Sequence, residues 1–115
     1  MRTLDLETEK MLAHVDEGVG WITFNQPEKR NAVSYAMWQV IPQIIEDFNS
    51  NEDVRVVVMS GAGDRAFVSG ADISEFEKLR NTPEQIEIYD AATSVSNKAL
   101  RSLEKPLIAM IRGFC

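Results

Sequence analysis

Cysteine and histidine are almost absent from this chain, and their scarcity limits what the protein can be. Cys115 is the single cysteine and His14 the single histidine. No disulfide can therefore form within the chain, and neither residue type can supply a metal-binding cluster. We expect no metal site. A lone cysteine also fits a reducing compartment, so we expect a cytoplasmic protein.

An excess of positive charge is also lacking. Twelve Lys and Arg residues face eighteen Asp and Glu residues, which leaves a net charge of -6. This balance argues against a nucleic acid or an anionic membrane surface as partner. No apolar run approaches the roughly 18 to 20 residues that cross a bilayer. The polar, acidic start MRTLDLETEK does not have the pattern of a signal peptide.

The composition that remains is typical of a globular protein. Hydrophobic residues make up 44% of the chain and charged residues 26%. The length fits one domain or part of one. We expect residues 1–10 to be a flexible lead-in and residues 11–115 to form the folded unit.

Runs of β-branched and apolar residues predict strands. Residues 11–15 and 19–24 are expected to form a two-stranded meander through the turn at Asp16-Glu17-Gly18. Residues 54–59 and 107–111 show almost no alternation, which indicates strands that are buried on both faces.

Helical spacing predicts the other elements. Residues 72–79 form a short predicted helix, and Thr82-Pro83 starts a longer one that runs to about Leu103. Apolar residues at helical spacing predict a further helix between Met37 and Phe48. Pro42 lies within it, so we expect a kink there or a helix that restarts near Ile41. Alternating strands and helices indicate the α/β class. The apolar stripe of the predicted helix that contains Pro42 consists of Met37, Val40, Ile41, Ile44, Ile45 and Phe48.

The stretch Arg55–Ile73, RVVVMSGAGDRAFVSGADI, is the most informative segment. A predicted strand ends in a glycine-rich turn, and a second small-residue corner, Gly70-Ala71, leads to Asp72, a good helix N-cap. Backbone N–H groups left unpaired at such a corner attract negative charge, whether phosphate, carboxylate or a developing oxyanion.

Two motifs have competing interpretations. Gly61-Ala62-Gly63-Asp64-Arg65-Ala66 matches the dinucleotide pattern G-x-G-x-x-G/A, but an extended segment follows it where that site needs a helix. A simple glycine-rich turn is therefore favoured over a nucleotide-binding α/β domain. In the loop from Asn25 to Ala32, Pro27 and Asn31 favour a structural role, while Lys29 and Arg30 could meet an anionic ligand.

Several motifs in register resemble the crotonase family, also called the enoyl-CoA hydratase/isomerase family. The resemblance covers the chain from about residue 11 to its end. It is carried by VGWITFNQP at residues 19–27, RNA at 30–32, VVVMSGAG at 56–63, AFVSGADI at 66–73 and KPLIAMIRG at 105–113.

This resemblance implies a spiral of β-β-α turns, a crotonase-like α/β fold, that binds acyl-CoA thioesters. It implies that the backbone N–H of Ala71 is one of two donors that stabilise an enolate-like oxyanion during syn addition of water to a 2-enoyl-CoA. No cofactor is implied beyond the coenzyme A of the substrate. The expected CoA-binding residues are Lys29, Arg30, Ala32, Ser69, Gly70, Ala71, Asp72 and Ile73.

The chain also departs from the family pattern. The second oxyanion donor and the acid–base glutamates are expected beyond Gly113, so this chain resembles the N-terminal part of the domain. We expect it to be inactive in this form, although hydratase or isomerase by descent. The alternative is a non-catalytic acyl-CoA-binding or oligomerisation module. The family also implies a homo-oligomer, a trimer or hexamer.

Overall fold

A mixed β-sheet forms the centre of the protein. The computed structural model describes all of residues 1–115. The strands lie in the order β1-β2-β3-β4-β5. The pairs β1–β2 and β2–β3 are antiparallel, whereas β3, β4 and β5 run parallel. Their bounds are β1 Arg2–Thr3, β2 Met11–Asp16, β3 Val19–Phe24, β4 Val56–Gly61 and β5 Leu107–Ala109.

The hairpin of β2 and β3 follows from the local sequence. Glu17 and Gly18 both have positive φ, at 49° and 83°. Two such residues form the tight turn whose twist matches that of the flanking strands. Alternate residues of β2 are buried, namely Met11, Ala13 and Val15. The predicted meander is therefore confirmed, with one face of each strand directed to the core.

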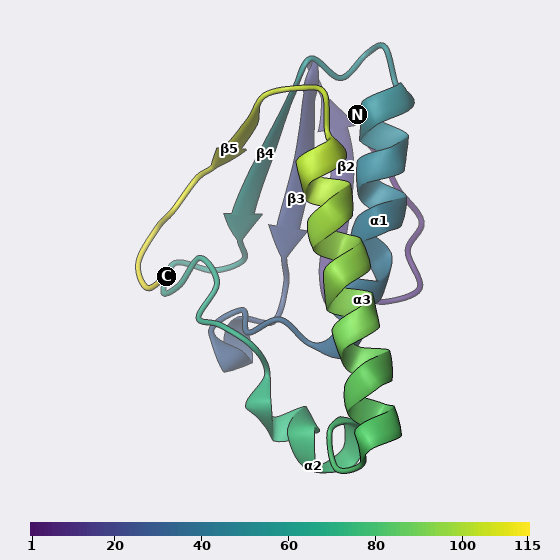
Figure 1. Ribbon diagram of the computed structural model, residues 1–115. Coiled ribbons are helices and arrows are strands. Elements are labelled where there is room, and N and C mark those ends of the chain that lie inside the picture. Colours follow the sequence, from purple (N-terminus) through teal and green to yellow (C-terminus); the bar gives the residue numbers. More distant parts are fainter.

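Two long helices lie side by side over one face of the sheet, as Figure 1 shows. Helix α1 contributes the six predicted stripe residues, all of them buried, and Thr82 caps α3 as predicted. The helices are the 3-10 helix η1 Pro27–Lys29, α1 Tyr35–Ser50, the 3-10 helix η2 Ile73–Glu75, α2 Phe76–Leu79 and α3 Pro83–Ser102.

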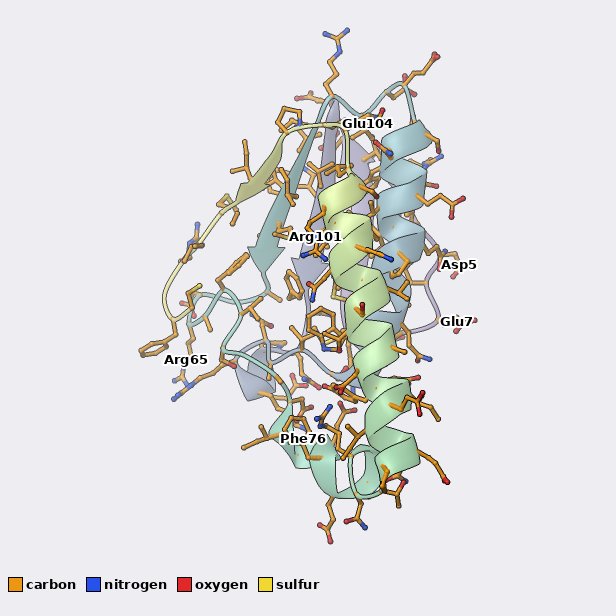
Figure 2. The ribbon with its side chains drawn as sticks, viewed as in Figure 1. Asp5, Glu7, Arg65, Phe76, Arg101 and Glu104 are labelled. Atoms are coloured by element: carbon orange, nitrogen blue, oxygen red, sulfur yellow. The ribbon has the colours of Figure 1, made fainter.

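The lead-in segment is placed against the fold. Arg2–Thr3 pairs with β2 as strand β1, and Leu4 and Leu6 pack against the core. Asp5 and Glu7 alternate with these leucines and point outward (Figure 2). The alternation of apolar and acidic residues gives this segment one face on the core. The flexible lead-in expected over residues 1–10 stays a prediction.

Two predicted strands are less buried than expected. In β4 Val57 is fully buried, whereas the other residues are partly exposed. Strand β5 spans three residues, not five, and all of them are exposed. The prediction of burial on both faces is wrong for this chain, because the helices cover one face of the sheet and β5 forms its edge.

Pro42 does not break its helix. Helix α1 continues through it without a restart. Proline lacks the N–H that would bond to the carbonyl four residues earlier, which here belongs to Trp38. The hydroxyl of Ser96 on α3 donates a hydrogen bond to that carbonyl. Ser96 is fully buried. The donor that α1 lacks therefore comes from α3, which joins the two helices.

We expect Ser96→Ala to lower the free energy of unfolding by about 1–3 kcal/mol, because it leaves the Trp38 carbonyl unpaired. In a Pro42→Ala background, residue 42 regains an N–H for that carbonyl, so the same substitution should cost clearly less. Urea unfolding of the four proteins of this cycle, followed by tryptophan fluorescence, measures both costs. Equal costs of Ser96→Ala in the two backgrounds would show that the serine does not replace the missing donor.

Candidate functional site

The segment after β4 crosses to the loop after β3 and pairs with it. Val33 donates a backbone hydrogen bond to the Gly70 carbonyl (2.7 Å) and accepts one from the Asp72 amide (3.0 Å). These two bonds form an isolated parallel bridge between Val33 and Ala71. Both bonds go to the neighbours of Ala71, so its own N–H points away from Val33. This amide donates no hydrogen bond within the chain, and Ala71 is exposed.

Gly70 lies beside this free amide. Its φ of +132° is a conformation that side chains rarely adopt, and a Cβ built there would meet no atom within 4 Å. The backbone conformation therefore calls for glycine, while the space in front of it stays open. An open approach next to an unpaired N–H is what a ligand oxygen needs to reach that donor.

The structure brings the two predicted groups of site residues together. The Ser69 amide donates to the Arg30 carbonyl (3.2 Å), and its hydroxyl donates to the Lys29 carbonyl (3.3 Å). Residues 29–33 and 69–72 thus run next to each other. Six predicted site residues are exposed there: Lys29, Arg30, Ser69, Gly70, Ala71 and Ile73.

The other two predicted site residues are buried. Asp72 is 3% exposed and Ala32 is 8% exposed. Asp72 caps η2 by accepting from the Ser74 amide (3.1 Å) and pairs with Lys29 (3.2 Å). Its role as an N-cap, predicted from the sequence, is confirmed. Its side chain faces the protein interior, so it holds the Ala71 segment in place and does not present a charge to solvent.

The Asp72 carboxyl is held in its ionised form. Burial acts to raise its pKa, but hydrogen bonds from Ser74 and Lys29 and the Lys29 charge outweigh burial. The pKa is therefore lowered from its ordinary value of 3.8. At neutral pH this carboxylate remains a charged acceptor for the groups around it.

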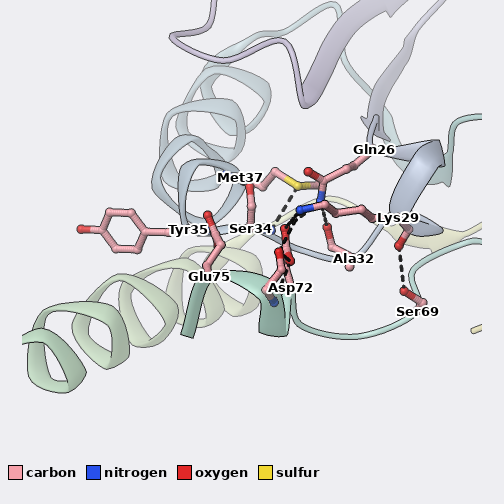
Figure 3. A network of polar contacts seen from close by, with 10 residues as sticks. Gln26, Lys29, Ala32, Ser34, Tyr35, Met37, Ser69, Asp72 and Glu75 are labelled. Carbon is pink, nitrogen blue, oxygen red and sulfur yellow. Dashed lines mark hydrogen bonds and ion pairs between the residues drawn. The ribbon is translucent and has the colours of Figure 1, made fainter. Parts of the chain in front are cut away.

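Gln26 and Asn31 are buried polar residues that hydrogen-bond to the segments of the site. Each is 1% exposed. Gln26 donates from Nε2 to the Ala32 carbonyl (2.8 Å) and to Asp72 Oδ2 (3.3 Å), as Figure 3 shows. Asn31 donates from Nδ2 to the carbonyls of Ala62 (2.9 Å) and Ala66 (3.0 Å). The structural role favoured for Asn31 is confirmed. Gln26 was not predicted, because no local pattern distinguishes a buried glutamine from an exposed loop residue.

Glu75 connects the same segment to helix α1. Its Oε1 accepts a hydrogen bond from the Tyr35 amide (2.8 Å), the first residue of that helix. A carboxylate is stabilised there by the unpaired N–H groups of a helix N-terminus. The stretch from Asp72 to Glu75 is therefore anchored at both ends.

The Gly61-x-Gly63 turn lacks the geometry of a dinucleotide site. Bends and two isolated bridge residues, Ala66 and Ala71, follow β4, and no helix begins there. A Cβ at Gly61 would lie 2.4 Å from the Phe67 carbonyl oxygen. Gly61 is thus required for close packing of its own chain. In Figure 2 Arg65, in the same turn, points outward near the C-terminal end.

Two other features, a metal-binding cluster and a membrane-spanning helix, are not found in the structure. No group of three or more His, Cys, Asp or Glu side chains is arranged to hold a metal ion. None of the helices combines the length and the apolar character needed to cross a bilayer.

Comparison with known proteins shows the family. A family model described as enoyl-CoA hydratase/isomerase matches residues 14–115. This chain therefore belongs to the enoyl-CoA hydratase/isomerase family, as its motifs predicted. The predicted α/β crotonase-like fold is likewise confirmed over the part that the chain spans.

Individual proteins with enoyl-CoA hydratase or related names also resemble this chain. The hydroxycinnamoyl-CoA hydratase-lyase of Pseudomonas fluorescens is 31% identical over 118 residues, which cover 100% of this chain and 42% of that protein. The short-chain-enoyl-CoA hydratase of Clostridium acetobutylicum is 31% identical over 109 residues, which cover 95% and 41%. The crystal structure of an enoyl-CoA hydratase/carnithine racemase from Magnetospirillum magneticum matches with a TM-score of 0.86 and 31% identity, over 93% of this chain and 40% of that one. The chain thus spans about two fifths of the length of these relatives.

Proposed function

We propose that this chain forms the N-terminal part of an acyl-CoA-binding site and that the Ala71 amide is one donor of its oxyanion hole. The observation that carries the proposal is the exposed, unpaired N–H of Ala71 beside the open face of Gly70. A backbone N–H held in place before the ligand arrives stabilises a developing oxyanion at little reorganisation cost.

Basic side chains near this amide suit the phosphates of coenzyme A. Lys29 is half-exposed, and the guanidinium of Arg30 lies 5.4 Å from the centre of the Phe114 ring. The chain as a whole has a net charge of -6. An anionic ligand is therefore attracted to this corner by local cations and not by the overall charge.

The chemistry assigned to the complete site is addition of water to a 2-enoyl-CoA, or isomerisation, through an enolate-like intermediate. In this chain one donor is present, and the second donor and the acid–base glutamates are expected in residues that follow Gly113 in the family. We therefore expect the 115-residue chain to bind acyl-CoA without turnover. A cytoplasmic location, for which the single cysteine is the argument, is part of the proposal.

Titration calorimetry with crotonyl-CoA tests this function. We expect binding to the unmodified chain, at least about tenfold weaker binding by Arg30→Gln because a charge-assisted contact to phosphate is lost, and no loss of the enoyl absorbance. Arg55→Gln is the matched control, since it removes the same charge at the opposite end of β4. There the backbone N–H of Arg55 donates a hydrogen bond to the Gly18 carbonyl, which the substitution keeps. Equal affinities of the two variants would contradict the assignment of Arg30.

A second candidate function is an oligomerisation module. Apolar side chains at and after β5 are exposed, and such a patch favours association. They are Leu107, Ile108, Met110, Ile111 and Phe114, which are 38% to 64% exposed. The expected trimer or hexamer remains a proposal that this patch supports. A folded chain that binds no acyl-CoA in the same calorimetry would leave this candidate in place of the first.

A further inference from the structure

Gln26 contacts the polypeptide on both sides of the bridge that presents the Ala71 amide. Its Nε2 donates to the carbonyl of Ala32, the residue before Val33, and to Oδ2 of Asp72, the residue after Ala71. Both hydrogens of the side-chain amide are thus used. The side chain is 1% exposed, so no solvent competes for these bonds.

The bridge itself is a weak support. Val33 and Ala71 form an isolated pair with two backbone hydrogen bonds, not part of a longer ladder. The Ala71 N–H shares its planar peptide with the Gly70 carbonyl, which accepts from Val33 (2.7 Å). The orientation of the Ala71 amide therefore depends on whether this short bridge is kept in place by the residues on either side of it, among them Asp72.

The three partners of the Asp72 side chain differ in how well they can hold it. Ser74 lies in the same turn and moves with it. Lys29 reaches Asp72 from a side chain that is 44% exposed, so water competes at the lysine end of this half-buried pair. Gln26 is buried and lies two residues after the end of β3, and its backbone N–H donates to Asn31 Oδ1 (2.9 Å). It is the partner that connects Asp72 to the sheet.

We propose that Gln26 is a positioning residue, whose buried side-chain amide fixes the backbone on both sides of the Val33–Ala71 bridge and so directs the Ala71 N–H toward the thioester oxygen. The inference rests on the proposed function for its ligand, but the orientation of the amide is a property of the free chain. It can therefore be tested both with and without acyl-CoA.

The first measurement is the NMR order parameter of the Ala71 N–H in the free chain. We expect about 0.85 in the unmodified protein and a fall toward about 0.6 in Gln26→Met, which keeps the volume and removes both hydrogen bonds. Gln26→Asn, whose shorter side chain cannot reach both acceptors, should lie between the two and carries the test if the methionine variant does not fold. Ser96→Ala is the control: it also removes a buried hydrogen bond, but between α1 and α3.

The second measurement compares two ligands, crotonyl-CoA and a butyl-CoA thioether that lacks the carbonyl oxygen. We expect Gln26→Met to weaken thioester binding by roughly three- to tenfold, the range for one hydrogen bond, and to leave thioether binding unchanged. Ser96→Ala should not alter the ratio of the two affinities.

The outcomes are separable. An unchanged order parameter at Ala71 in Gln26→Met overturns the positioning role, whatever the chain binds. An equal loss of both ligands overturns it as well, because a general structural defect does not distinguish a carbonyl. If the unmodified chain binds neither ligand, the proposed function fails while the order parameter still decides the role of Gln26.

Discussion

Replacing Gly61 with alanine is expected to lower the free energy of unfolding by about 3 kcal/mol or more. A Cβ at this position would lie 2.4 Å from the Phe67 carbonyl oxygen, 2.5 Å from that of Ala66 and 2.7 Å from Asn31 Nδ2. Two of these atoms belong to backbone, which cannot rotate away as a side chain can. Relief requires moving the whole segment that leads to Ala71, and overpacking of this kind costs at least as much as the upper part of its usual range.

Gly63→Ala is the matched control for this experiment, because it lies in the same turn. Its φ of +78° costs an alanine about 1–2 kcal/mol, but the nearest atom to a Cβ is Pro27 Cβ at an ordinary 3.6 Å. Urea unfolding of the two variants, followed by tryptophan fluorescence, gives both costs. If Gly63→Ala were as damaging as Gly61→Ala, backbone crowding at Gly61 would not be the reason that glycine is needed there.

Replacing Asn31 with aspartate should also cost about 3 kcal/mol or more at neutral pH. The Nδ2 group of Asn31 donates to two carbonyls, and a carboxylate would bring a negative oxygen against them in a site that is 1% exposed. Breaking a buried pairing so that a charge is left uncompensated typically costs about 3–5 kcal/mol, which is the size of the loss expected here.

Asn51→Asp provides the control with the same change of atoms. Asn51 uses its Oδ1 to accept from the Asp53 amide at the surface, and an aspartate keeps that acceptor. We expect its stability to change by less than about 0.5 kcal/mol. Parallel urea titrations of both variants make the comparison. A loss below about 1 kcal/mol for Asn31→Asp would show that the loop does not depend on the two donated bonds.

The elements that could be predicted are those whose signal is local. The stripe of α1 repeats with the helical period, and Thr82-Pro83 starts α3 where expected. The short predicted helix at residues 72–79 is divided into η2 and α2. Pro42 shows the limit of local inference: the kink or restart expected there depends on an unpaired carbonyl, and Ser96, 58 residues from Trp38, pairs it.

Burial of the polar site residues could not be predicted in the same way. Asp72 was expected among the residues that contact CoA, yet its side chain is enclosed by Gln26, Lys29 and Ser74. Gln26 lies 46 positions from Asp72 in the chain, and no spacing rule relates two such residues. Only the pairing of residues 29–33 with 69–72 makes them neighbours.

The family followed from the resemblance of several sequence motifs in register. The main strands and helices followed from periodicity, capping and turn residues, because these act over a few residues. The unpaired state of the Ala71 amide, and the burial of Gln26 and Asp72 behind it, became evident only in the folded chain. Val33 forms hydrogen bonds with Gly70 and Asp72, the residues on either side of Ala71, and leaves the Ala71 N–H unpaired. That geometry exists once two distant segments lie side by side.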